Sequence, residues 1–106
     1  MPKRTRKYEE SLTEALKDPV EAAAYLNACL EDDGEGDAEE LFLVALRDVA
    51  KAHGFTEVAS KSKIGRESLY KVLSEEGNPT LATLSALLHA MGLRISVEAE
   101  QGRKSA

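Results

Sequence analysis

Apolar residues recur three or four positions apart along most of this 106-residue chain, which is the spacing of one face of an α-helix. This pattern predicts helices over residues 8–17, 19–30, 38–53 and 81–91. Aromatic residues make up only 5% of the sequence, so we expect aliphatic side chains to fill the core. The core positions predicted in the last two of these helices are Leu41, Ala45, Val49, Leu81, Leu84, Leu87, Leu88 and Met91.

Residues typical of helix ends support these boundaries. Asp18 precedes Pro19, and Asp is a favoured N-cap while Pro is favoured at the first helical position. Thr80 can cap the helix that follows it in the same way. Gly54 and Gly92 each follow a predicted helix and mark its end.

The stretch between Phe55 and Leu73, FTEVASKSKIGRESLYKVL, predicts two short helices joined by a tight turn at residues 63–65. The Thr56 hydroxyl is expected to cap the first helix. The second helix runs from about Arg66, and its apolar residues fall on one face because they are spaced three and four apart. A helix with an apolar back and a polar front suits the DNA major groove.

The polar front of this second helix supplies the candidate DNA-binding residues. Arg66 and Lys71 are the best candidates for base contacts, and an arginine paired bidentately with guanine gives about 1–3 kcal/mol of discrimination. Glu67 can accept from a cytosine amino group or orient a neighbouring cation. The full set of predicted DNA contacts is Lys61, Ser62, Lys63, Arg66, Glu67, Ser68, Tyr70, Lys71, Asn78 and Thr80. A solvated helix face is the alternative for every one of these residues.

The apolar period changes near the C-terminus. Residues 93–100, LRISVEAE, alternate apolar and polar side chains, which predicts a half-buried β-strand. A lone strand leaves its backbone groups unpaired, so we expect it to pair with the same strand of a second copy. The predicted dimer contacts are Leu93, Ile95, Val97 and Ala99. A segment folded back on its own helices is the alternative.

The formal net charge of −5 hides an uneven distribution. Residues 8–48 contain thirteen acidic side chains against Lys17 and Arg47. Residues 1–7 are basic, and residues 49–75 carry a mild excess of base. DNA binding needs local positive potential, so the net charge does not exclude it. The basic tail is either an arm that reaches DNA or a solubilising segment that touches nothing.

The sequence offers little that supports catalysis or metal binding. Cys29 is the single cysteine, which excludes an internal disulfide and a cysteine-rich metal site. Residues 31–40 are acidic but lack the frame of a calcium loop, so they are either a solvated linker or a docking surface for a basic partner. We therefore predict no enzyme, no catalytic residue, no metal and no cofactor. No apolar run is long enough to span a membrane, and the start lacks a signal peptide, so we expect a cytoplasmic protein.

The chain resembles the HigA-like antidote proteins (antitoxins) of bacterial addiction modules, with an Xre/Cro-type helix-turn-helix. The resemblance covers about residues 8–99 and is most specific at three stretches: DP with AYL at 18–26, RESLYK at 66–71, and GNPT at 77–80. Two residues depart from the usual turn. Lys63 stands where such turns have Gly, at a cost of about 1 kcal/mol if φ is positive, and Gly65 stands where Ser or Thr caps.

The resemblance implies a type II antitoxin that neutralises a small basic toxin of the RelE/ParE-like kind. It also implies that a homodimer binds double-stranded operator DNA and represses its own operon. A stand-alone Xre-family regulator without a toxin, and an interaction module that has lost its DNA contacts, are the alternatives. A neighbouring short gene for a basic protein would favour the antitoxin over the stand-alone regulator.

We therefore expect an all-α fold: a Cro/Xre-like bundle of five to six helices with a C-terminal β-strand that pairs across a dimer. The expected organisation is a disordered basic tail (1–7), a helical extension with an acidic loop (8–36), the helix-turn-helix domain (37–92), the dimerisation strand (93–100) and a disordered tail (101–106).

Overall fold

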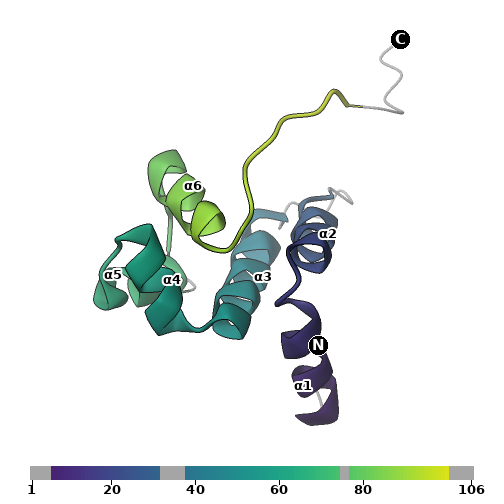
Figure 1. The fold of residues 1–106 in the computed structure, drawn as a ribbon. Helices are drawn as coiled ribbons and strands as arrows, with labels where there is room; N and C mark the ends of the chain where they lie inside the picture. The colour runs from purple at the N-terminus through teal and green to yellow at the C-terminus, as the bar shows by residue number, and fades with distance from the viewer. Residues whose placement is uncertain (1–5, 32–37, 75–76, 101–106) are drawn as a thin grey trace.

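The computed structural model describes residues 6–31, 38–74 and 77–100, and over these residues it is all α-helical (Figure 1). Residues 1–5 of the expected basic tail (1–7), residues 32–37 of the acidic stretch (31–40) and the expected tail at 101–106 lie outside the described residues. Residues 6 and 7, expected in the tail, belong instead to the first helix. The helices are α1 (Arg6–Ala15), α2 (Pro19–Leu30), α3 (Ala38–His53), α4 (Phe55–Ser62), α5 (Arg66–Val72) and α6 (Leu81–Ala90). The all-α class and the number of helices are as predicted.

Local chemistry explains where most helices begin and end. The Asp18 side chain accepts a hydrogen bond from the Val20 N–H at 3.0 Å, and Pro19 occupies the first turn of α2. The Thr80 hydroxyl accepts from the Thr83 N–H at 3.1 Å and caps α6. Both caps were predicted. The predicted cap at Thr56 is wrong, because α4 starts at Phe55 after Gly54, whose positive φ of 94° turns the chain sharply out of α3.

The helices pack as two neighbouring groups around α3 and α4. Helix α2 packs along α3, and α1 and α4 also contact α3. Helix α4 in turn contacts α5 and α6 (Figure 1). One polar contact lies within the first group and one joins the two groups: the Tyr25 hydroxyl of α2 donates to Asp48 of α3 at 2.7 Å, and Arg47 Nε of α3 donates to the Leu73 carbonyl at 2.8 Å. The second contact fastens α3 to the end of α5.

The buried side chains of the described residues are all aliphatic, as the low aromatic content predicted. They are Leu16, Ala22, Leu26, Ala45, Leu46, Val49, Ala50, Ala52, Val58, Ala59, Leu69, Leu73, Leu87, Leu88 and Met91. Two predicted core residues are wrong: Leu41 is 44% exposed and Leu81 is 71% exposed. Both lie in the first turn of their helices, where fewer neighbouring residues can cover them.

The predicted C-terminal β-strand is absent from the single chain. Residues 93–100 leave α6 as extended, non-helical chain, and no β-strand occurs in the described parts of the molecule (Figure 1). The physical reason is that a strand is defined by its backbone partner. The alternating sequence gives these residues strand-like faces, but no other described segment pairs with them. None of the described helices combines the length and apolar character needed to cross a bilayer.

Candidate nucleic-acid interface

Three residues form the turn between α4 and α5. Lys63 ends α4 in the left-handed region, with φ 63° and ψ 25°, and its N–H donates to the Ser60 carbonyl at 3.3 Å. Gly65 precedes α5 in an extended conformation, and no side chain caps the helix there. Both departures predicted for this turn are therefore present. The Ser62 hydroxyl accepts from the Ile64 N–H at 3.3 Å and donates to the Ala59 carbonyl at 3.4 Å, so it braces the turn.

Apolar contacts fix the back of α5 against α4. Val58 and Ala59 of α4 and Leu69 of α5 are buried, and Ile64 and Val72 pack against the same core. Helix α5 has only seven residues, so its position depends on this packing more than on its own helical stability. The result is a short helix held by one face.

The opposite face of α5 is exposed and polar, as predicted. Its exposed side chains are Arg66, Glu67, Ser68, Tyr70 and Lys71. Arg66 Nη2 donates to the Tyr70 hydroxyl at 2.9 Å, and its guanidinium carbon lies 5.7 Å from the centroid of the Tyr70 ring. The Tyr70 ring packs against Phe55 with centroids 5.1 Å apart and planes inclined by 52°. Two aromatic side chains thus support the Arg66 guanidinium: Tyr70 contacts it directly, and Phe55 at the start of α4 packs behind Tyr70.

Sequence reasoning missed two residues that support this face. The Phe55 ring packs against the Tyr70 ring, and Arg47 donates a hydrogen bond to the Leu73 carbonyl at the end of α5. Helical spacing carries no signal for Arg47, because its partner lies 26 positions away. Phe55 was visible as an aromatic residue beside Gly54, but a helical pattern cannot show which ring it meets.

Two lysines flank the polar face. Lys61 and Lys63 are both exposed. Lys61 Nζ lies 3.3 Å from a Glu57 carboxylate oxygen one turn earlier in α4, and both side chains are more than half exposed. This is a surface ion pair of the kind that contributes about 1 kcal/mol or less, so it leaves Lys61 available to another anion.

Asn78 and Thr80 lie exposed just before α6. The Thr80 hydroxyl is committed to the α6 cap, so its side chain is not free to reach a ligand. The backbone N–H groups of the first α6 turn are what this position offers an anion. Gly77 allows the chain to pass close to α5, because a Cβ there would overlap the Val72 carbonyl.

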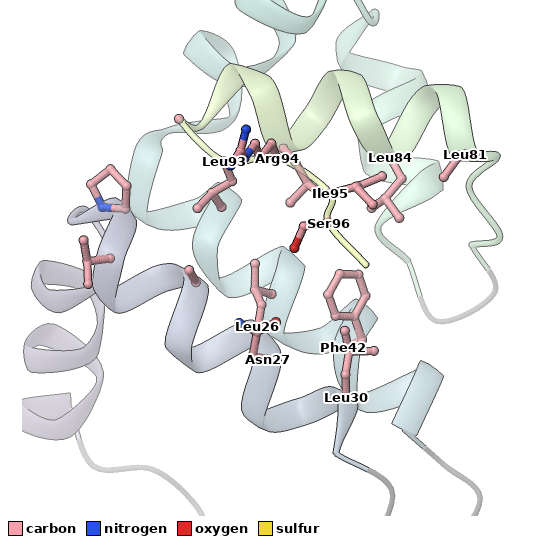
Figure 2. A pocket seen from close by; sticks show the side chains of 15 residues that line it. Leu26, Asn27, Leu30, Phe42, Leu81, Leu84, Leu93, Arg94, Ile95 and Ser96 are labelled. Atoms are coloured by element: carbon pink, nitrogen blue, oxygen red, sulfur yellow. The ribbon is translucent and has the colours of Figure 1, made fainter. Parts of the chain in front are cut away.

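A second feature is an apolar groove of about 670 Å³ between α2, α6 and the C-terminal segment (Figure 2). Leu26, Leu30 and Phe42 line one side, and Leu81 and Leu84 line the other. Leu93 and Ile95 of the C-terminal segment run between them. Of the four predicted dimer contacts, Leu93 is half-buried, whereas Ile95, Val97 and Ala99 are exposed.

The surroundings of the Cys29 thiol decide its reactivity. Burial, and after it the negative charge of Asp48, raise the pKa of the Cys29 thiol above its ordinary value of 9.0. The thiol is therefore protonated at neutral pH and is a poor nucleophile. Among the described residues, no group of three or more His, Cys, Asp or Glu side chains is placed to hold a metal ion.

Comparisons with known proteins identify the family. Residues 6–99 match the family described as "Probable addiction module antidote protein". A Haemophilus influenzae (strain ATCC 51907 / DSM 11121 / KW20 / Rd) protein, itself described as an uncharacterized protein, is 39% identical over 87 residues, which cover 82% of this chain and 86% of that protein. No solved structure matches the chain. Since the family match spans all six helices and the segment after them, the chain belongs to the family of probable addiction module antidote proteins.

Proposed function

We propose that this protein is a DNA-binding antitoxin of a type II toxin–antitoxin module, and that α4 and α5 act as an Xre/Cro-type, HigA-like helix-turn-helix. The observation that carries the proposal is the front of α5, where Arg66 is held in place by Tyr70 above a fully apolar back. A cation fixed before binding loses less side-chain entropy when it meets a base edge. Family membership supplies the antitoxin half of the proposal.

Each predicted residue has a role in this arrangement. Arg66 and Lys71 read base edges in the major groove, with Glu67 and Ser68 beside them. Lys61 and Lys63 contact phosphates and set the register of α5. Ser62 acts indirectly, by bracing the turn. Asn78 and Thr80 present the α6 N-terminus to a phosphate through backbone N–H groups.

The acidic part of the molecule is the proposed contact for the toxin. Helices α1 and α2 and the residues around them carry Glu9, Glu10, Glu14, Asp18, Glu21 and Glu31. A small basic toxin of the RelE/ParE-like kind complements such a surface, because opposite potentials steer two proteins together. The toxin would then occupy one end of the molecule while α5 faces the operator. We place both events in the cytoplasm and propose that a homodimer represses its own operon, with no catalytic step.

The direct test measures binding of the protein to the DNA upstream of its gene, with fluorescence anisotropy as the readout, over a series of salt concentrations. We expect tight binding that weakens as the salt concentration rises. A plot of the logarithm of the binding constant against the logarithm of the salt concentration should have a slope of about −0.9 for each phosphate contacted. Arg66→Ala is expected to cost about 1–3 kcal/mol and to relax the preference for one base. Lys71→Ala should weaken the same complex.

Lys17→Ala is the matched control for Lys71→Ala, since it removes one exposed positive charge from the turn between α1 and α2. Equal binding to operator and random DNA by the unaltered protein would overturn the DNA-binding proposal. If operator binding appears only after the neighbouring gene product is added, the protein requires its toxin as a co-repressor. Capture of that gene product by the purified protein tests the antitoxin role independently of DNA.

A further inference from the structure

The C-terminal segment, residues 93–100, presents an apolar edge that the other described residues cover only at Leu93. Its apolar side chains become more exposed with distance from α6: Leu93 is half-buried, Ile95 is 40% exposed and Val97 is 93% exposed. Figure 1 shows the segment running away from the helices. A β-branched residue exposed to this extent next to two other apolar residues indicates a surface that is completed by a partner.

The groove beside this segment is uncovered in the same way. Val20 at the start of α2 is 75% exposed and Leu81 at the start of α6 is 71% exposed, and both line it together with Ile95 (Figure 2). Apolar side chains on three separate elements therefore face one opening. The occupant must be apolar, narrow and able to pass next to an extended backbone.

We infer that the occupant is the C-terminal segment of a second copy, paired antiparallel with Ser96 of one chain opposite Ser96 of the other. The inference rests on the homodimer proposed above, for which it specifies the interface and its register. It does not depend on DNA binding or on a toxin. Each segment then becomes a strand only in the dimer. Pairing gives its backbone groups beyond Leu93 strand partners that no other described segment supplies; the Leu93 N–H itself donates to the Leu88 carbonyl at 2.8 Å.

Charge and apolar pattern together select this register. In an antiparallel pair, residues directly opposite each other lie on the same face of the ribbon. With Ser96 on the two-fold axis, Arg94 lies opposite Glu98 of the second copy, and the same ion pair repeats on the other side of the axis. Ile95 lies opposite Val97, and Leu93 lies opposite Ala99. All four apolar positions of each segment therefore meet apolar positions of the other on one face.

Neighbouring registers fit less well. With Ile95 on the axis, Arg94 meets Ser96 and Glu98 meets Gly92, so both charges lose an opposite partner. With Val97 on the axis, Arg94 lies opposite Glu100. Leu93 then has no apolar residue of the second copy opposite it, and Ser96 lies opposite Glu98. If one strand instead slides by a single residue relative to the other, so that the axis passes between two residues, apolar side chains lie opposite polar ones throughout. In the preferred register, Val97 of the second copy lies next to Ile95, at the groove.

Site-specific cross-linking tests the register. Ser96→Cys, Ile95→Cys and Val97→Cys are made separately in a Cys29→Ser background, and each protein is oxidised mildly without DNA. Directly opposite residues have Cα atoms about 4.5–5.5 Å apart, which lies within the range a disulfide spans. We expect Ser96→Cys to form a covalent dimer at least about ten times faster than Ser11→Cys, an exposed control on α1 that matches the substitution.

The outcomes separate the register from the dimer. Faster cross-linking at Val97→Cys or Ile95→Cys than at Ser96→Cys overturns the register. Sedimentation of the Cys29→Ser protein as a monomer overturns the dimer itself, and leaves the groove to another partner such as the toxin. A dimer by sedimentation that cross-links at none of the three positions places the interface elsewhere and also overturns the inference.

Charge reversal provides a second readout that does not require cysteine. Arg94→Glu and Glu98→Arg each place two like-charged pairs across the axis, so each is expected to raise the dimer dissociation constant by about tenfold. The double variant restores opposite charges in the same register and should return the constant to near its original value. Failure of the double variant to recover, with both single variants folded by circular dichroism, would contradict the Arg94–Glu98 pairing.

Discussion

Tyr70 lies between an apolar ring and a cation, so a single substitution can separate its two contacts. Tyr70→Phe keeps the ring against Phe55 and removes the hydroxyl that accepts from Arg66. The guanidinium then samples more rotamers before it binds. A typical hydrogen bond contributes about 0.5–1.5 kcal/mol, so we expect operator affinity to fall about two- to tenfold by anisotropy, with little change in melting temperature.

Tyr8→Phe is the control, because Tyr8 is an exposed tyrosine on α1, far from α5. It should leave operator affinity unchanged. If Tyr70→Phe binds the operator as well as the unaltered protein, the Arg66–Tyr70 contact plays no part in recognition. The loss should also be smaller in a protein that already carries Arg66→Ala, since the two residues act through one contact.

Cys29 shows how the environment of one residue can exclude a reaction. Its raised pKa means that a smaller fraction of the thiol is ionised at any pH below that pKa. We expect iodoacetamide to modify Cys29 at least about three times more slowly than a cysteine in a flexible peptide at pH 8. The rate should keep rising as the pH passes 9.0, the ordinary value. A rate that levels off below pH 9.0 would contradict the direction of the shift.

At the scale of elements, the turn between α4 and α5 stores backbone strain at Lys63. An L-residue in the left-handed region costs about 1–2 kcal/mol, and glycine avoids this cost but loses more chain entropy on folding, by about 0.4–1 kcal/mol. Lys63→Gly should therefore raise the free energy of unfolding by about 0.5–1 kcal/mol. Urea denaturation followed by circular dichroism measures the change.

Lys63→Ala is the matched control for this substitution. It removes the same charge but keeps a Cβ in the left-handed region, so its stability should stay close to that of the original protein. The two variants also separate folding from recognition. Both lack the proposed phosphate contact, so both should lose operator affinity, although only one gains stability.

Helix ends were predictable where a side chain makes the cap. Asp18 with Pro19 and Thr80 each satisfy backbone N–H groups through short-range chemistry, and the structure places both caps as predicted. The predicted cap at Thr56 failed because Gly54 turns the chain two residues earlier through its positive φ, which only glycine adopts easily. The sequence showed a glycine after α3, but not that α4 would begin directly after it.

Burial was predictable only where a neighbouring element exists in the same chain. Helical spacing correctly placed Ala45, Val49 and Leu87 in the core. It failed at Leu81 because periodicity shows which residues share a face, and not whether another element covers that face. Leu81 lines the open groove beside the C-terminal segment. Strand pairing failed for the same reason, since it depends on a partner outside the sequence being read.

At the scale of the whole molecule, charge is divided between the two ends. Several acidic side chains lie on α1, α2 and the first turn of α3, namely Glu9, Glu10, Glu14, Glu21, Glu39 and Glu40, although α1 also carries Arg6 and Lys7. The exposed cations Lys61, Lys63, Arg66 and Lys71 outnumber Glu57 and Glu67 on α4, α5 and the turn between them. Interactions between exposed charges farther apart than about 8–10 Å are largely screened at physiological salt. The acidic end therefore does not prevent the basic end from approaching DNA, despite the net charge of −5.

This division predicts that a carboxylate near α5 weakens DNA binding, whereas a similar carboxylate on α1 has no effect. Glu57 pairs with Lys61 at 3.3 Å, and Glu14 pairs with Lys17 at the same distance. Glu57→Gln releases Lys61 and removes a negative charge near the phosphates, so we expect operator affinity to rise about two- to fivefold, in line with the size of surface ion pairs. Glu14→Gln makes the same chemical change at the other end and should leave affinity unchanged. Since salt screens both contributions, the gain from Glu57→Gln should shrink as the salt concentration increases. An equal gain from both variants would mean that net charge, and not the position of Lys61, controls binding.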